Sequence, residues 1–446
     1  MNSGRRRNSF KAWWLGNMLN QQSTLREKMV LFWHNHFATE MKTVDNPTMI
    51  YKHHVLLRQY ALGNFKAMVR AVTVDAAMLK YLNGNANTKK APDENYGREL
   101  QELFTLGKGP GSQYTEADVK AAARVLTGFR INNRSLPDVH GEFDAGRHDE
   151  RDKQFSAFYN NQVIKGRSGK EGEAELDDLL NLIFQQPEVA RFICRKLYRY
   201  FVYHHIDEVT EKNIIEPLAH TFRQHNYDIK PVLERLLSSR HFFDAGNRGG
   251  IIKSPVDLAV GLCREYNIGF PGEENYVELY QLWFNIQTIA SQMQQNIGDP
   301  PNVAGWPAYY HEPLYDKSWI SSDTLPKRTA FTDRMVSNGF ARNDKKILID
   351  PLQYTRQLSA PGDPNKLIDE LADLLYAVEL PVEEKQYMKT AILLQGLQGM
   401  ASDHYWRDAW NKLQEKPDDA ANAKNVTNKL KNLLKYMMSL PQYQLM

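Results

Sequence analysis

The chain has 446 residues, of which 42% are hydrophobic and 24% are charged, a composition typical of a soluble globular protein. Its 56 lysines and arginines against 53 aspartates and glutamates leave a net charge of +3, which gives no electrostatic reason to expect nucleic-acid binding. No apolar run approaches the roughly 18 residues of a transmembrane helix, so no membrane span is predicted. Cys194 and Cys263 lie in separate apolar helices and are interpreted as buried thiols rather than as a disulfide.

Apolar residues spaced three and four positions apart predict helices along most of the chain. The predicted helices cover residues 10–22, 24–38, 47–61, 93–106, 115–128, 174–185, 187–203, 209–225, 229–239, 255–266, 274–296, 318–336, 365–378, 382–398, 402–413 and 420–438. Several starts carry their own signals, such as Pro47 after Asn46 and the capping pair Thr115 and Asp118. The sequence therefore predicts an all-α fold, an orthogonal array of many helices.

Three segments interrupt this pattern. Residues 130–172 are rich in Gly, Asn, Asp and charge, and are expected to form an excursion with at most a small β-hairpin. Loops of this length inside a compact domain are usually functional. Residues 298–307 contain three prolines, and residues 349–364 are interpreted as a linker. The predicted domains are a main helical domain over 1–348, which includes the excursion, and a C-terminal helical subdomain over 365–446 packed on it.

The predicted helix 24–38 contains the run Trp33-His34-Asn35-His36-Phe37. His36 lies near the centre of the apolar arc, whereas His34 falls on the far side of the helix. Because residues two apart on a helix diverge by about 200°, the two histidines are not expected to bind one metal ion together. His36 alone is either a hydrogen-bonded core histidine or part of a site.

The predicted helix 93–106 places Glu99 inside its apolar arc, where a carboxylate is costly unless it is paired or protonated. On the helical wheel the arc consists of Tyr96, Leu100, Leu103, Phe104 and Leu106, and the opposite side of Glu94, Arg98, Gln101 and Thr105. Glu99 is therefore either the partner of an arginine on a neighbouring helix or a general acid or base with a raised pKa.

Other polar residues could complete such a pocket. Asn95 and Glu102 flank Glu99 at the edge of the same face. No histidine follows Glu99 or Glu102 by three positions, which argues against a di-iron centre of the helical-bundle type. His148, Asp149 and Lys153 lie in the excursion, where they are either solvated or part of a lid over a site. The arginines of the helix 187–203 form either a solvated basic face or an anion-binding surface, and the near-neutral total charge favours the former.

Several sequence blocks occur together in a characteristic order. They are EKMVLFWHNHF (27–37), ALGNF (61–65), ENYGRELQELFTLG (94–107), YTEADV (114–119), AARVLTG (122–128), HD (148–149), PPNVAGWP (300–307) and LPQYQ (440–444). In these blocks, and essentially from Phe10 to the C-terminus, the chain strongly resembles the bacterial domain-of-unknown-function 1800 family. The chain departs from the family pattern after Asp149, where the turn that leads to Lys153 is altered, and it lacks the helical stretch that usually precedes the first block.

The resemblance implies a mostly helical bacterial protein, often exported or associated with the cell envelope, whose activity is unproven. It also implies a partner protein encoded nearby, and it supplies no established catalytic residue and no cofactor. The chain begins without an export signal, so we expect a cytoplasmic protein if Met1 is the natural start and an exported one if the chain is truncated.

We hypothesise an enzyme that hydrolyses or modifies an envelope or extracellular polymer. Glu99 would be its general acid or base, and His36, as hydrogen-bond partner of Glu99, together with His148 and Asp149 would be further catalytic residues. The residues predicted to contact the substrate are Asn95, Glu102, Lys153, Asn302 and Trp306. The alternative is a non-catalytic helical scaffold in which the same side chains tie helices together. No metal ligand is predicted, although metal-dependent catalysis remains a third hypothesis that elemental analysis would test.

Overall fold

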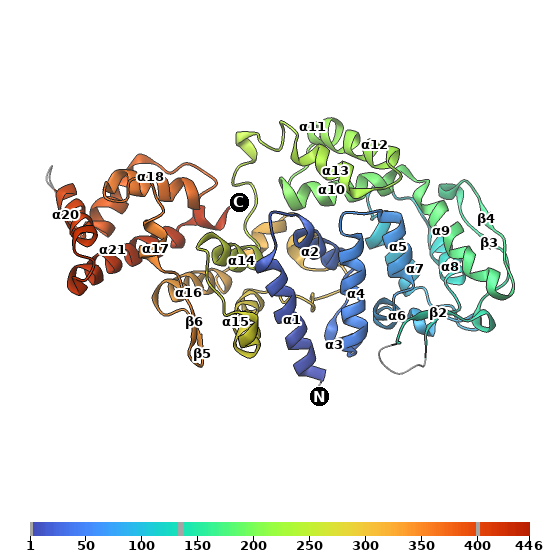
Figure 1. Cartoon of the computed structure of the whole chain (residues 1–446). Helices are drawn as coiled ribbons and strands as arrows, with labels where there is room; N and C mark the ends of the chain where they lie inside the picture. The colour runs from blue at the N-terminus through green and yellow to red at the C-terminus, as the bar shows by residue number, and fades with distance from the viewer. Residues whose placement is uncertain (1–2, 133–137, 398–401) are drawn as a thin grey trace. The chain divides into compact units, whose positions relative to one another are not determined.

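The computed structural model describes residues 3–132, 138–397 and 402–446, most of which are helical (Figure 1). Strands in this part of the chain form only two-stranded antiparallel hairpins. The prediction of a predominantly helical fold is therefore confirmed. None of the described helices is both long and apolar enough to cross a membrane.

Contacts divide the chain into two compact units. The first contains Met1–Phe10, Gln21–Phe243 and Ile297–Tyr315, and the second contains Lys11–Asn20, Asp244–Asn296 and Asp316–Met446, so that α1 (Ser3–Asn20) contributes to both. A short helix, α17 (Pro351–Thr355), lies within the predicted linker 349–364, and the residues on both sides of it belong to the second unit. A domain boundary at 349–364 stays a prediction.

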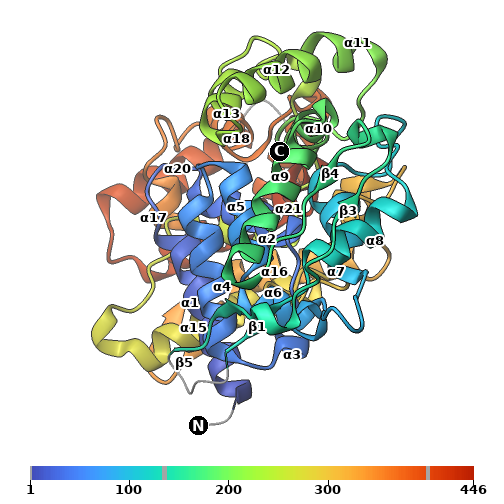
Figure 2. The same ribbon diagram turned by 90° about the vertical axis from the view of Figure 1, so that its right-hand side faces the viewer.

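The first unit is built from short and medium helices. They are α2 (Arg26–His36), α3 (Met41–Val44), α4 (Pro47–Tyr60), α5 (Phe65–Thr73), α6 (Ala76–Tyr81), α7 (Asn95–Glu99), α8 (Glu116–Val125), α9 (Glu175–Phe184), α10 (Pro187–Phe201), α11 (Glu208–Thr210), α12 (Glu216–Gln224) and α13 (Ile229–Leu237). Helix α4 packs against both α2 and α5, and the three run close together in both ribbon views (Figures 1 and 2).

Helix α2 is buried on all sides. Trp33 is completely buried and stacks on Phe37 and Phe65, with ring centroids 5.9 and 5.4 Å apart. His34, placed by the sequence pattern on the far side of this helix, is buried as well. A helix without an exposed face is typical of the centre of a large core.

The segment predicted as one helix over 93–106 changes type in the middle. Helix α7 ends at Glu99 and is continued by a π-helix, Leu100–Thr105. Because a π-turn holds an extra residue, it rotates the following side chains relative to an α-helix. Gln101 and Thr105, expected to face away from the core, are therefore fully buried, whereas Leu103 is partly exposed.

The predicted excursion contains two hairpins rather than one. Strands β1 (Phe129–Ile131) and β2 (Gly141–Phe143) pair with each other, as do β3 (Lys153–Gln154) and β4 (Val163–Ile164). Between β3 and β4, the buried Tyr159 donates a hydrogen bond of 2.7 Å from its hydroxyl to Oε1 of Gln101. The backbone N–H and the hydroxyl of Ser156 both donate to Asp118 in α8. Buried contacts therefore attach this part of the excursion to α8 and to the π-helix.

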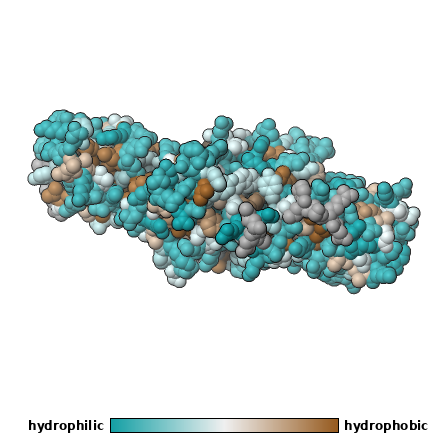
Figure 3. All heavy atoms as spheres, turned by 60° about the horizontal axis from the view of Figure 1, so that its bottom comes forward, coloured by the Kyte–Doolittle hydropathy of each residue, from teal (hydrophilic) through white to brown (hydrophobic). Residues whose placement is uncertain are grey.

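The second unit contains the remaining helices and one hairpin. They are α14 (Pro255–Glu265), α15 (Tyr276–Gln292), α16 (Thr324–Ser337), α17, α18 (Pro364–Leu375), α19 (Val382–Tyr387), α20 (Ser402–Glu415) and α21 (Ala420–Ser439), with strands β5 (Phe340–Arg342) and β6 (Lys345–Ile347). Gly16 of α1 touches the Trp283 ring so closely that a Cβ there would lie 2.6 Å from it, so only glycine fits. On the face drawn in Figure 3, hydrophobic side chains are scattered among hydrophilic ones.

Candidate functional site

The side chains of His34 and Asn35 hold a distant segment of the first unit. Nε2 of His34 accepts a hydrogen bond from the Gly298 N–H (3.1 Å), and Oδ1 of Asn35 accepts one from the Trp306 N–H (2.8 Å). Gly305, with a φ of 89°, lies so close to Asn35 that a Cβ there would overlap its side chain. These two residues thus act as polar ties for residues 298–306.

Trp306 and Asn302, two of the residues predicted to contact the substrate, differ in their exposure to solvent. Trp306 is only 1% exposed, and its ring lies 5.7 Å from that of His34. Asn302 is exposed and donates a hydrogen bond of 2.9 Å from Nδ2 to the Tyr310 hydroxyl. Of these two residues, only Asn302 therefore lies at the surface of the protein.

His36 is buried and has a partner for each ring nitrogen. Nε2 lies 3.0 Å from the Phe104 carbonyl oxygen, at the end of the π-helix, and Nδ1 lies 2.9 Å from Nζ of Lys196 in α10. A carbonyl can only accept a hydrogen bond, so Nε2 carries the proton and Nδ1 accepts from the lysine. Burial, together with the charge of Lys196, keeps the pKa of His36 well below its usual value, so the ring is neutral. Since both nitrogens are occupied, His36 is not the hydrogen-bond partner of Glu99.

Glu99 is partly buried, and its Oε2 is buried with no hydrogen-bond partner among the described residues. Burial, and then the nearby Glu102 carboxylate, raise the pKa of Glu99, whereas Lys108 and Arg98 act in the opposite direction. Arg98 itself pairs with Glu94 and Glu116. The expected arginine partner from a neighbouring helix is not seen in the described part of the chain.

Glu102 differs from Glu99 in that it has a cationic partner. Its Oε1 forms an ion pair of 2.5 Å with Nζ of Lys108. The Glu102 carboxylate is close enough to Glu99 to raise the pKa of Glu99. The two carboxylates are thus neighbours in different environments: among the described residues Oε2 of Glu99 has no hydrogen-bond partner, whereas Glu102 is paired with Lys108.

Two tyrosines that the sequence did not single out adjoin this pair. Burial raises the pKa of Tyr114 to about 12, with a further contribution from Glu102, so its hydroxyl stays a donor. Burial also raises the pKa of Tyr81, to which Glu40 and Glu99 contribute. Asn95 is exposed, and its Nδ2 donates to the Leu82 carbonyl oxygen at 3.3 Å.

His148, Asp149 and Lys153 come together around a residue that the sequence analysis missed, Glu175 at the start of α9. Lys153 and Glu175 are both completely buried and form an ion pair, and the Lys153 ammonium also donates to the Asp149 carbonyl. Nε2 of His148 lies 3.2 Å from Oε1 of Glu175. We refer to these four residues as the Glu175 cluster.

Every charge in the Glu175 cluster has a partner. Burial alone would raise the pKa of Glu175, but hydrogen bonds from Lys153 and from the Arg167 backbone N–H outweigh it and lower the pKa. Asp149 likewise accepts from Arg124 (2.8 Å) and Arg151 (2.6 Å), which hold its pKa far below the usual range despite burial. Such saturation is typical of a structural anchor, here one that fastens the excursion to α9.

One signal in the sequence could have identified Glu175. It lies four and seven positions before Leu179 and Leu182, on the apolar face of its helix, as Glu99 does in its own. The hydrogen bonds and ion pairs of the described residues do not join Glu99 to His36 or to the Glu175 cluster. The single site predicted from the sequence is thus not joined by hydrogen bonds or ion pairs among the described residues, and it stays a prediction.

Two arginines of α10, Arg191 and Arg195, are half-buried and form ion pairs, in contrast to the expected solvated face. Arg191 pairs with Glu216, and Arg195 pairs with Glu188 and Glu211. In the part of the chain that the structure describes, no group of three or more histidine, cysteine, aspartate or glutamate side chains is arranged to hold a metal ion.

Comparison with known proteins identifies the family. A family model described as "Protein of unknown function (DUF1800)" matches residues 1–445, essentially the whole chain. The chain belongs to the DUF1800 family. No curated protein and no solved structure matches it.

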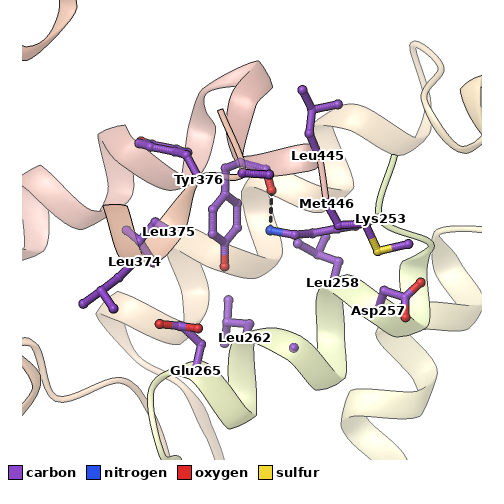
Figure 4. Close-up of a pocket in the computed structure, with 13 residues that line it drawn as sticks. Lys253, Asp257, Leu258, Leu262, Glu265, Leu374, Leu375, Tyr376, Leu445 and Met446 are labelled. Carbon is purple, nitrogen blue, oxygen red and sulfur yellow. Dashed lines mark hydrogen bonds between the residues drawn. The ribbon is translucent and has the colours of Figure 1, made fainter. Parts of the chain in front are cut away.

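One block that carries the family resemblance, residues 440–444, contributes to a cavity of about 320 Å³ in the second unit (Figure 4). Leucines of α14 and α18 line it together with Tyr443, Leu445 and Met446. Lys253 donates a hydrogen bond of 2.8 Å to the Tyr443 carbonyl oxygen, and burial lowers the pKa of this lysine to about 8. None of the site residues predicted from the sequence lines this cavity.

Proposed function

We propose that this DUF1800 protein is an enzyme in which Glu99 acts as a general acid or base and Glu102 as its partner carboxylate. The observation that supports this proposal is the buried Oε2 of Glu99, which has no hydrogen-bond partner among the described residues, beside a carboxylate that is paired with Lys108. A pair of carboxyl groups, one of them with a raised pKa, is the usual arrangement for hydrolysis of glycosidic bonds.

In this proposal Glu99 keeps its proton at a higher pH than an ordinary glutamate and donates it to the leaving-group oxygen. Glu102 supplies the negative charge that activates water or stabilises a developing cation. The hydroxyls of Tyr81 and Tyr114, kept protonated, would orient the substrate. The proposal that the substrate is an envelope or extracellular polymer rests on the family resemblance alone.

The other predicted residues receive more limited roles. His36 would act as a positioning residue, because its bond to the Phe104 carbonyl fixes the end of the π-helix that begins directly after Glu99. His148, Asp149 and Lys153 would hold the excursion in place. Asn95 and Asn302, both exposed, remain the proposed substrate contacts, whereas the buried Trp306 would support Asn302 from below the surface.

The test is Glu99→Gln, with the exposed Glu171→Gln as matched control. Activity is measured as soluble fragments released from a panel of bacterial polysaccharides and peptidoglycan. We expect Glu99→Gln to lower activity by at least ~100-fold with an unchanged circular dichroism spectrum, and Glu171→Gln to leave it unchanged. Equal activity of Glu99→Gln and the native protein would refute the assignment.

A second candidate is the non-catalytic scaffold, which is supported by the saturation of the Glu175 cluster and by the ties from His34 and Asn35. It predicts that the native protein releases no fragments and that Glu99→Gln changes only stability, by roughly 1–3 kcal/mol. It further predicts binding to a partner protein encoded nearby, which co-purification of the two proteins measures.

A further inference from the structure

The amine of Lys196 in α10 lies beside the neutral imidazole of His36. Its Nζ lies 2.9 Å from Nδ1 of His36, whose tautomer is set by the Phe104 carbonyl oxygen on the other side of the ring. The imidazole therefore accepts a hydrogen bond from the lysine but offers no negative charge. Phe192, four residues earlier on the same helix, places its ring centroid 5.0 Å from Nζ.

The ion pairs of α10 set Lys196 apart from the neighbouring arginines. Among the described residues Lys196 forms no ion pair, whereas the nearby Arg191 and Arg195 are both paired with glutamates. Arg199, one turn further along α10, repels the ammonium form of Lys196. Burial and Arg199 lower the pKa of Lys196 from 10.5 to about 7. A partly buried lysine without a counter-charge is the usual form of a nucleophilic amine.

We propose that Lys196 is a nucleophilic amine that forms an imine with a carbonyl compound carrying an anionic group, and that Arg199 binds this anion. Arg199 lies one turn from Lys196 on the same helix, close enough for one small molecule to reach both. Its guanidinium donates to the His204 carbonyl oxygen at 3.2 Å and lies 5.0 Å from the Tyr315 ring centroid, contacts that leave its charge without a carboxylate partner in the described part of the chain. This proposal does not depend on the role of Glu99.

The chemistry requires no further reactant. Nζ attacks the carbonyl carbon, the C=O π electrons move to oxygen, and a proton passes from nitrogen to that oxygen to give a carbinolamine. The nitrogen lone pair then forms the C=N bond as the hydroxyl leaves, and the hydroxyl takes up the second proton of the nitrogen, so that one water is released for each imine formed. His36 acts as a positioning residue, because its Nδ1 holds one N–H of the amine and so directs the lone pair of Nζ away from the ring.

The experiment traps the imine with pyridoxal 5′-phosphate, an anionic aldehyde, followed by borohydride reduction and peptide mapping of the full chain. At pH 7 we expect Lys196 to be labelled at least about tenfold faster than any other lysine. Pyridoxal, which lacks the phosphate, should label Lys196 more slowly, and Arg199→Gln should remove this difference between the two aldehydes. Labelling of Lys196 should already be half-maximal near pH 7.

Two variants complete the test. Lys196→Arg, which keeps the charge but removes the amine, should abolish the fast label, whereas the exposed Lys212→Arg should not. Glu99→Gln should label like the native protein, so a failure of the proposed hydrolase is distinguishable from a failure of this site. If labelling follows exposure alone, with Lys196 labelled no faster than Lys212, the proposal is overturned. This comparison uses the native protein, so it holds even if a variant does not fold. Equal rates with pyridoxal and its phosphate would overturn the role of Arg199.

Discussion

Glu99 and Glu175 occupy equivalent positions, each on the apolar side of a helix in the first unit, but their surroundings differ. Glu175 is completely buried and is paired with Lys153 and with the Arg167 backbone N–H, so its pKa is lowered. Glu99 keeps one buried oxygen without a partner, and its pKa is raised. A buried carboxylate is therefore informative only once its partners are known: full pairing indicates an anchor, and incomplete pairing indicates a candidate for chemistry.

The largest expected effect comes from breaking the buried ion pair. Lys153→Met leaves the Glu175 carboxylate buried without its cation, and we expect a loss of about 3–5 kcal/mol in the free energy of unfolding. Urea denaturation measures it. Adding Glu175→Leu should recover most of the loss, because it removes the uncompensated charge. A double variant as unstable as the single one would contradict the pairing.

Glu175→Gln should lower stability by about 2 kcal/mol at pH 7, the value of hydrogen bonds to a charged group. Because folding lowers the pKa of Glu175, its contribution is present above the unfolded pKa near 4.5 and is lost as the pH falls through the folded pKa. The difference between variant and native protein should therefore shrink below about pH 4. Denaturation at several pH values measures this slope, and a constant difference would argue against the anchor.

Tyr159→Phe should cost about 1 kcal/mol, since it removes the hydrogen bond to Oε1 of Gln101 without opening a cavity. Tyr114→Phe serves as a control, because the described hydrogen bonds of its hydroxyl include none to Gln101. Thermal denaturation of the two variants compares them. Equal melting temperatures for Tyr159→Phe and the native protein would show that this contact does not stabilise the excursion.

The smallest stability effect is expected for Glu99→Gln, at most about 1 kcal/mol, and in the stabilising direction. Folding raises the pKa of Glu99, so the native protein loses stability as the pH rises from about 4.5 through the folded pKa. The advantage of the variant should therefore appear near neutral pH and disappear in acid, opposite to the slope for Glu175→Gln. The same slope in both variants would contradict the contrast between the two carboxylates.

The sequence predicted most helices well, because their apolar spacing is a local property. The helix predicted over 420–438 is observed as Ala420–Ser439, and the one over 187–203 as Pro187–Phe201. The π-helix after Glu99 could not be predicted in the same way, since the wheel assumes a constant rotation per residue. As a result, the helical wheel places Gln101, Thr105 and Leu103 on the wrong sides of this helix.

The partners of the polar residues were beyond the local pattern. Glu99 was recognised as unusual, yet Glu175 was missed although its helical face gives the same signal. The sequence around Lys196 does not distinguish it from the arginines of its helix, because its environment is created by His36, 160 residues away in the sequence. Contacts between distant segments, rather than the residues themselves, separate an anchor from a reactive group.

The bonds of His34 and Asn35 to residues 298–306 also have a consequence for biosynthesis. Trp306 follows Asn35 by 271 residues, and the chain of the second unit from Asp244 to Asn296 is made in between. Such distant contacts form late, because a long loop must close before they stabilise the fold. The N-terminal helices of the first unit therefore emerge from the ribosome with His34 and Asn35 still lacking their final partners, and the first unit is completed only after part of the second has been synthesised.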